Sequence, residues 1–177
     1  MAGGIYLVGV AHKIQWLPQN SSVWRREIFV QFCDYLAVAA KCLGVAMIAE
    51  EFNDDALDGW PSAEVACRDV SKRMQLRHLY ADPTCEERKS LGIGKCEHQA
   101  PNEVANCSDC SRREEWWLEK LGKLGDECVI FVCGEFHVNT FKQRLKRAGW
   151  PATLISDGWA TPKSHCAELM EFGGLKI

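Results

Sequence analysis

Two short motifs in this sequence place a histidine three residues after a glycine. His12 follows Gly9 at this spacing, and His137 follows Gly134. A continuous apolar run precedes each motif, which is typical of a strand buried on both faces. Residues just past the carboxyl ends of strands line the ligand crevice of an α/β sheet. We therefore expect His12 and His137 to converge on one substrate or metal.

Carboxylates occupy comparable positions. Glu50 and Glu51 come directly after the apolar run at residues 45–49. Side chains alternate along a strand, so one of the two should face the crevice and the other should point away. Asp82 precedes a proline and either lies at a third strand end or begins a turn, and the turn is favoured. The sequence does not choose between Glu50 and Glu51.

An arginine pair lies before the second histidine motif. Ser111 and Glu114 form a capping-box pattern, which predicts that a helix begins there and that Arg112 and Arg113 lie in its first turn. Basic residues are disfavoured at that end of a helix unless a negative group is near. One of the arginines is therefore expected to pair with a glutamate or to contact an oxyanion on a substrate.

These side chains suit hydrolysis by two routes. A neutral imidazole can take a proton from water near pH 7, a carboxylate can orient it, and an arginine can stabilise an oxyanion. Alternatively, His12, His137 and Glu50 could bind a divalent metal (manganese, cobalt or zinc) with an open position for water. The sequence leaves both routes open.

A second group of candidate ligands lies in residues 91–110. The stretch reads as a long loop, and it contains Cys96, His98, Cys107 and Cys110. Long loops in compact domains are usually functional or mobile. Three thiols and an imidazole could form a tetrahedral, structural zinc site that clips the loop. Reduced thiols without a metal are the alternative.

The apolar pattern predicts one α/β domain over residues 1–177. Two strand–helix–strand units are expected, in an N-terminal half (about 5–60) and a C-terminal half (about 111–156). Together they predict a mixed, largely parallel sheet of about five strands flanked by helices. Among the helices, 23–43 has an apolar stripe and Gly44 as its C-terminal cap. Helices over 61–76 and 164–171 and a last strand over 152–155 are also predicted.

Composition narrows the class of protein. The net charge is −3, so no polycationic surface for nucleic acid is expected, and the basic side chains of residues 142–147 are interpreted as a solvated helix face. The chain shows no signal-peptide pattern and no apolar stretch of about 20 residues, so no membrane partner is expected. We expect a cytoplasmic protein with a small-molecule or peptide substrate. The oligomeric state stays open, a homo-oligomer included.

The order of these motifs resembles the superfamily that contains TraB, Tiki, erythromycin esterase and the ChaN-like proteins. The resemblance implies a mixed α/β fold of two related halves with a hydrolytic site between them. Family members include metal-dependent proteases and an esterase thought to use histidine without metal. This chain is much shorter than the better-known members, so their substrates do not carry over. The residues that carry the resemblance are Gly9, His12, Glu50, Glu51, Arg113, Glu114, Gly134 and His137.

Three hypotheses follow from the sequence. The first is a hydrolase that acts on an ester, amide or peptide bond through the two histidines, a glutamate and an arginine. The second is a binding module that sequesters a small anion in the same crevice without chemistry. The third is a protein-interaction surface clipped by zinc in residues 91–110.

Overall fold

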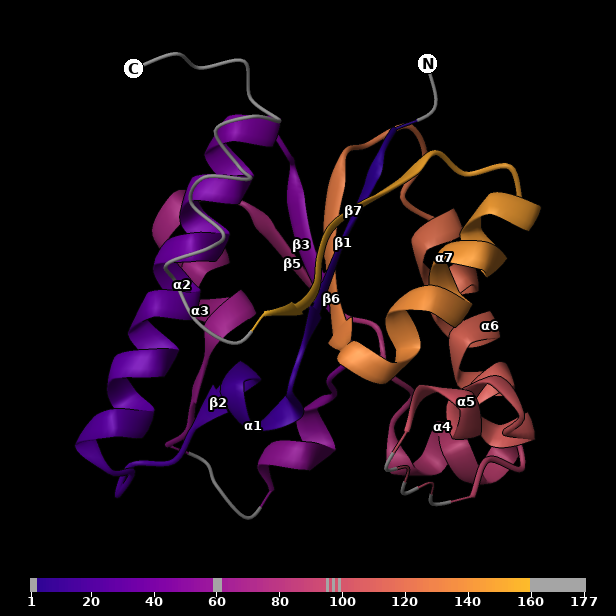
Figure 1. Ribbon diagram of the computed structural model, residues 1–177, viewed down its shortest axis with the longest axis horizontal. Coiled ribbons are helices and arrows are strands. Elements are labelled where there is room, and N and C mark those ends of the chain that lie inside the picture. The colour runs from indigo at the N-terminus through magenta and orange to yellow at the C-terminus, as the bar shows by residue number, and fades with distance from the viewer. Residues whose placement is uncertain (1–2, 59–61, 95, 97, 99, 160–177) are drawn as a thin grey trace.

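A computed structural model of the chain describes residues 3–58, 62–94, 96, 98 and 100–159 (Figure 1). Its central feature is a sheet of five strands in the order β5-β3-β6-β1-β7, and every neighbouring pair in it is parallel. A separate antiparallel pair is formed by β2 and β4. The predicted α/β class, with about five strands, is confirmed.

The elements alternate along the chain, as expected for a parallel sheet. The strands are β1 (Ile5–Val10), β2 (Trp16–Leu17), β3 (Met47–Glu50), β4 (Glu64–Val65), β5 (Arg77–Tyr80), β6 (Val129–Gly134) and β7 (Ala152–Trp159). The α-helices are α1 (His12–Gln15), α2 (Val23–Leu43), α3 (Ala66–Met74), α4 (Cys85–Ser90), α5 (Pro101–Ala105), α6 (Ser108–Gly122) and α7 (Val138–Arg147). Two 3₁₀-helices, η1 (Asp54–Leu57) and η2 (Glu135–His137), complete the described part.

Helices cover both faces of the sheet (Figure 1). On one face, α2 and α3 pack their apolar side chains against alternate residues of the strands, such as Ile48 and Ile130. On the other face, α6 and α7 pack against the residues between them, such as Ala49 and Phe131. The strands are therefore buried on both sides, which explains their continuous apolar sequences.

The connections reverse direction at the centre of the sheet. From β1 the chain runs through α2 to β3, and β6 lies between those two strands. From β6 it runs through α7, on the opposite face, to β7, and β1 lies between. The adjacent strands β1 and β6 thus form a topological switch point, where open α/β sheets bind ligands beyond the carboxyl ends of the strands.

Local signals in the sequence located the longest helix. Ser22 caps the N-terminus of α2 by accepting a hydrogen bond from the backbone N–H of Arg25. Gly44 ends the helix in the left-handed conformation with φ of 60°, which glycine adopts without steric cost. The helix predicted over 23–43 therefore has the observed bounds.

Other boundaries differ from the predictions. The helix expected over 61–76 is shorter, because β4 precedes α3, and the strand expected to end at residue 155 continues to Trp159. Helix α6 begins at Ser108 with Cys107 as its cap, not at Ser111, so Arg112 and Arg113 lie beyond its first turn. The segment 91–110 contains α5 and is not a continuous loop. The helix predicted over 164–171 lies outside the described residues.

Within the described part of the chain, none of the helices combines the length and the apolar character that a membrane span requires.

Candidate active site at the switch point

A cavity of about 400 Å³ opens at the carboxyl ends of β1 and β6. Both predicted histidines border it, each from the segment that follows one of these strands. Its remaining walls come from α6 and from the cysteine-containing segment before it. The lining residues that matter for the chemistry are His12, Lys13, Cys96, His98, Arg113 and His137.

The glycines of the two motifs allow close packing around this cavity. A Cβ atom on Gly134 would lie 2.6 Å from Nε2 of His12, so a side chain here would displace the imidazole. A Cβ atom on Gly9 would lie 2.4 Å from a methyl group of Val138, in the first turn of α7. The motif spacing therefore reflects steric needs at the point where the two strands end.

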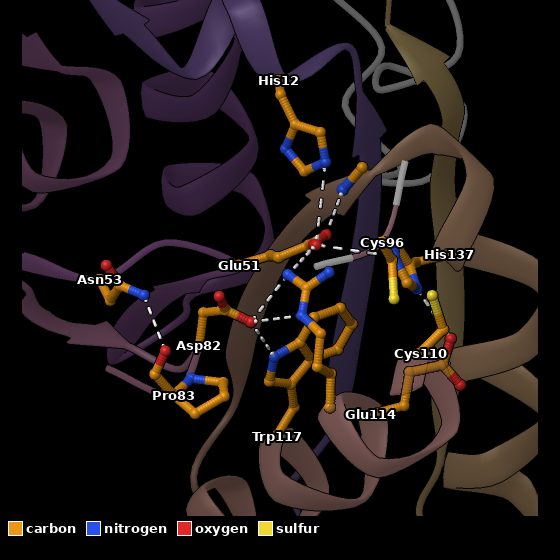
Figure 2. A network of polar contacts seen from close by, with 12 residues as sticks. His12, Glu51, Asn53, Asp82, Pro83, Cys96, Cys110, Glu114, Trp117 and His137 are labelled. Carbon is orange, nitrogen blue, oxygen red and sulfur yellow. Dashed lines mark hydrogen bonds and ion pairs between the residues drawn. The ribbon is translucent and has the colours of Figure 1, made fainter. Parts of the chain in front are cut away.

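Glu51 is the centre of the polar network (Figure 2). Its Oε1 accepts a hydrogen bond of 2.5 Å from Nη2 of Arg113 and lies 3.8 Å from Nε2 of His12 and 3.6 Å from Nε2 of His137. Its Oε2 accepts a 2.8 Å hydrogen bond from the backbone N–H of Gly134. The predicted histidines and arginine thus meet at this carboxylate.

Arg113 is held in place by Asp82. The Nε and Nη2 groups of Arg113 donate to Oδ1 of Asp82 at 3.0 and 2.8 Å, and the indole N–H of Trp117 donates to the same oxygen at 3.0 Å. Arg88 pairs with the other carboxylate oxygen of Asp82. Asp82 therefore positions Arg113 and Trp117 and lies behind the cavity, and the Nη1 group of Arg113 takes no part in these bonds.

His137 is oriented by Glu114. The imidazole is buried, and its Nδ1 lies 2.9 Å from Oε1 of Glu114, so Nδ1–H donates to the carboxylate. Thr140 donates to the same oxygen, and Arg144 contacts the other one at 3.4 Å. The ring therefore has one nitrogen fixed by Glu114 and the other facing Glu51.

These contacts shift two ionisation equilibria. Burial acts to raise the pKa of Glu51, but His137, Arg113, His12 and the Gly134 N–H outweigh it and lower that pKa below its ordinary value. Burial acts to lower the pKa of His137, but the carboxylates of Glu51 and Glu114 outweigh it and raise that pKa. The network thus favours an ionised Glu51 beside a protonated His137.

His12 has a different environment from His137. Its side chain is 59% exposed, at the mouth of the cavity. The side-chain amide of Gln15, one turn further along, lies 3.1 Å from Nδ1 of His12. With Nδ1 bonded to this amide, Nε2 faces Glu51 and the cavity.

Glu50 does not belong to this site. Its side chain points to the face of the sheet that α2 and α3 cover, and its Oε1 lies 2.7 Å from Nε2 of His78. Complete burial there raises the pKa of Glu50, although His78 acts to lower it. Because Glu50 and Glu51 are adjacent, the pleat sends them to opposite faces. A metal site built from His12, His137 and Glu50 therefore does not fit this arrangement.

The structure also settles which arginine faces the cavity. Arg113 does, whereas Arg112 is half exposed, donates to the carbonyl of Gly92 and lies near Asp109. Glu114 is buried against His137 instead of capping a helix start, and Arg144, interpreted from the sequence as part of a solvated face, contacts it. One signal in the sequence could have indicated that Glu114 is buried. It lies three residues before Trp117 on the same helix, so the two side chains share one face.

Cys133 lies close to His137 in the sequence but is a core residue. It is fully buried in β6, and burial together with the charge of Glu51 raises its pKa well above the ordinary thiol value. A thiol nucleophile needs access and thiolate character. Cys133 lacks both.

A separate cluster of potential metal ligands borders the same cavity. The donor atoms of Cys96, His98, Cys107 and Cys110 all lie within 4.8 Å of one another, so this group could bind a metal ion. The two closest approaches are 3.4 Å between the sulfurs of Cys96 and Cys107 and 3.1 Å between Nε2 of His98 and the sulfur of Cys110. In Figure 2, Cys96 and Cys110 lie on the same side of the network as His137.

The chain matches no protein-family model, no curated protein and no solved structure. The resemblance to the erythromycin esterase and TraB group therefore stays a prediction, and the site has to be interpreted from its own geometry.

Proposed function

We propose that this protein hydrolyses an ester, amide or peptide bond in the cavity between His12 and His137. The observation that carries the proposal is the pairing of His137 with Glu114 at 2.9 Å, with the other ring nitrogen facing Glu51 and the cavity. A histidine oriented by a buried carboxylate, with its free nitrogen toward a ligand cavity, is well suited to general acid–base catalysis.

The two histidines are suited to opposite roles. His12 is exposed at the cavity mouth and would take a proton from the attacking water. His137, whose raised pKa favours the imidazolium, would donate its Nε2 proton to the leaving oxygen or nitrogen. Water supplies the nucleophilic oxygen, the bond to the leaving group breaks, and solvent returns the proton from His12 to His137.

The charges around the cavity support stabilisation of an anionic intermediate. The carboxylates of Glu51, Asp82 and Glu114 are matched by the guanidinium groups of Arg88, Arg113 and Arg144. An imidazolium at His137 would place a positive charge at the wall of the cavity, near the guanidinium of Arg113. The Nη1 group of Arg113 is available to contact the oxyanion of a tetrahedral intermediate.

This chemistry can be tested directly in water enriched in oxygen-18. Wild-type protein would be incubated with 4-nitrophenyl esters, amino-acid amides and short peptides, and the acid products analysed by mass spectrometry. We expect one heavy oxygen in the product and turnover that survives added chelator at early times. Absence of product from every substrate class would contradict the proposal.

The alternative function is a binding module for a small anion, and the same positive charge favours it. It predicts saturable, salt-sensitive binding that is lost on Arg113→Gln, with the ligand recovered unchanged after long incubation. Acetate and phosphate are suitable probes because each is a small anion that Arg113 could bind.

For the cysteine and histidine cluster we propose a single structural zinc ion. Three thiolates and one imidazole are the ligands that select zinc among the common divalent metals, and four protein ligands leave no position for a reacting water. Two sulfurs bound to one tetrahedral zinc ion lie about 3.8 Å apart, near the 3.4 Å between Cys96 and Cys107. Such an ion supplies folding energy and no catalytic step.

Elemental analysis of the purified protein tests this assignment. One zinc per chain is expected in the wild type, in His12→Gln and in Cys85→Ser, which alters an exposed cysteine outside the cluster. Cys107→Ser should lose the metal. Metal that is lost in His12→Gln and kept in Cys107→Ser would refute the assignment and point to the histidine pair.

A further inference from the structure

The metal-ligand cluster and the candidate active site share a wall. Cys96, His98 and Val104 line the same cavity as Arg113 and His137. Helix α5, which connects His98 to Cys107 along the chain, packs against η2, the short helix that ends in His137. A change in the position of this segment would therefore change the shape of the cavity directly.

The cluster also holds the beginning of the helix that supplies the polar network. Cys107 caps α6, accepting a hydrogen bond from the backbone N–H of Cys110. Arg113 and Glu114 follow Cys110 by three and four residues, so all three lie on one side of the helix. The buried stripe of α6 consists of Cys110, Glu114, Trp117 and Leu121.

Few other contacts hold the segment that carries Cys96 and His98. Between Gly92 and Cys107, the buried apolar side chains of the described residues are those of Ile93 and Val104. Outside the cluster itself, the hydrogen bonds of the described residues in this stretch are local, apart from the one that Arg112 donates to Gly92. Residues with so little apolar burial have low local stability, so a bound ion would supply much of what keeps them against the cavity.

We propose that zinc bound by Cys96, His98, Cys107 and Cys110 is a positioning element for the active site. The ion fixes the wall formed by Cys96, His98 and Val104 together with the first turn of α6. Through that helix it holds Arg113 against Glu51 and Glu114 against His137. The inference rests on the proposed zinc site and on the proposed hydrolytic site. It adds a coupling between them, with the ion itself outside the reaction.

Two consequences follow from such a coupling. Loss of the ion should free residues 100–114 and the η2 turn. The sheet should keep its structure, because both of its apolar layers lie elsewhere. Coupling is also reciprocal, so a ligand in the cavity should tighten zinc binding by the factor by which zinc tightens the binding of that ligand.

Hydrogen–deuterium exchange on the full chain tests the coupling without a substrate. Wild-type protein would be compared as isolated, after removal of zinc with a chelator, and after zinc is added back. We expect removal to speed exchange about tenfold or more in residues 107–114 and 135–137, with β3 and β6 unchanged. Adding zinc back should restore the slow exchange, and Cys85→Ser should behave as the wild type.

The outcomes separate the coupling from the proposals on which it rests. If the protein binds zinc but loss of the ion speeds exchange only in residues 100–106, the coupling is overturned and the zinc ion is only a local structural clip. Protein that contains no zinc and takes none up would overturn the zinc site and with it this inference. Neither result depends on turnover, so a failure of the hydrolase proposal would be seen separately, in the product analysis. If chelation unfolds the chain, Cys96→Ser provides the state with weakened zinc binding to compare, because it removes one ligand and keeps Cys107 as the cap of α6.

Discussion

Glu50 and Glu51 are adjacent in the chain, but their carboxylates lie in different environments on opposite faces of the sheet. Glu51 accepts hydrogen bonds from Arg113 and Gly134, and its pKa is lowered. Glu50 is buried on the opposite face beside His78, and its pKa is raised. Glu51 is therefore the ionised centre of the candidate site, whereas the environment of Glu50 favours its protonated form.

The negative charge of Glu114 can be removed with little change in side-chain shape. Glu114→Gln keeps an oxygen for the Nδ1–H of His137 but removes the negative charge that helps to raise the pKa of His137. We expect kcat to fall about tenfold to a hundredfold and the alkaline limb of the pH–rate profile to move to lower pH. Glu115→Gln, which changes an exposed neighbour, should leave the profile unchanged.

Asp82 should matter for stability as well as for activity, because its carboxylate anchors buried donors of Arg113 and Trp117. Asp82→Asn leaves these donors with a neutral partner that has one acceptor oxygen fewer. The free energy of unfolding should fall by about 1–3 kcal/mol in urea titrations. The exposed Asp157→Asn is the matched control, and an equal loss in both variants would argue against this anchoring role.

At the scale of elements, the close approach of β6 to the first histidine motif can be tested with one methyl group. Gly134 has φ of −55° and ψ of 137°, a conformation open to alanine, but a Cβ atom would contact Nε2 of His12. Because His12 is exposed, it can move aside at little cost in stability. We expect Gly134→Ala to keep the melting temperature and to lose about tenfold to a hundredfold in kcat/KM.

The comparison variant is Gly122→Ala, at the end of α6, where an added Cβ atom meets nothing within 4 Å. It should match the wild type in turnover. If Gly134→Ala were as active as Gly122→Ala, the position of His12 against Glu51 would not matter for the reaction.

Elements with strong local signals could be predicted, and those set by tertiary contacts could not. Helix α2 has a capping serine and a terminal glycine, so its bounds were readable from the sequence. Helix α6 carries a capping-box pattern at Ser111, yet Glu114 turns inward to His137 and Cys107 caps the helix instead. A buried partner from another element overrode the local pattern there.

At the scale of the molecule, the sequence could bring the two candidate histidines together because the parallel topology places strand ends at one edge of the sheet. Apolar runs and the two glycine–histidine motifs were sufficient to expect His12 and His137 together. The strand order could not be predicted, because β6 inserts between β1 and β3 through contacts remote in the sequence. The choice of Glu51 over Glu50 and of Arg113 over Arg112 depends on that packing.

The network also predicts a pH dependence of stability. The folded-state pKa of His137 is raised, so its stabilising contribution is full below the unfolded value of about 6.5 and is lost as the pH rises through the folded value. The difference in free energy of unfolding between the wild type and His137→Gln should therefore be largest below about pH 6.5 and shrink as the pH rises above that value. A difference that grows with pH would contradict the ionised pairing.

The most direct test of the proposed site compares two histidines that each lie beside one of the adjacent glutamates. Esters of 4-nitrophenol would be hydrolysed by the wild type, by His12→Gln at the cavity and by His78→Gln beside Glu50. We predict that His12→Gln loses about 10²-fold or more in kcat/KM with unchanged thermal unfolding, and that His78→Gln keeps wild-type turnover. Equal activity in all three proteins would contradict a catalytic His12.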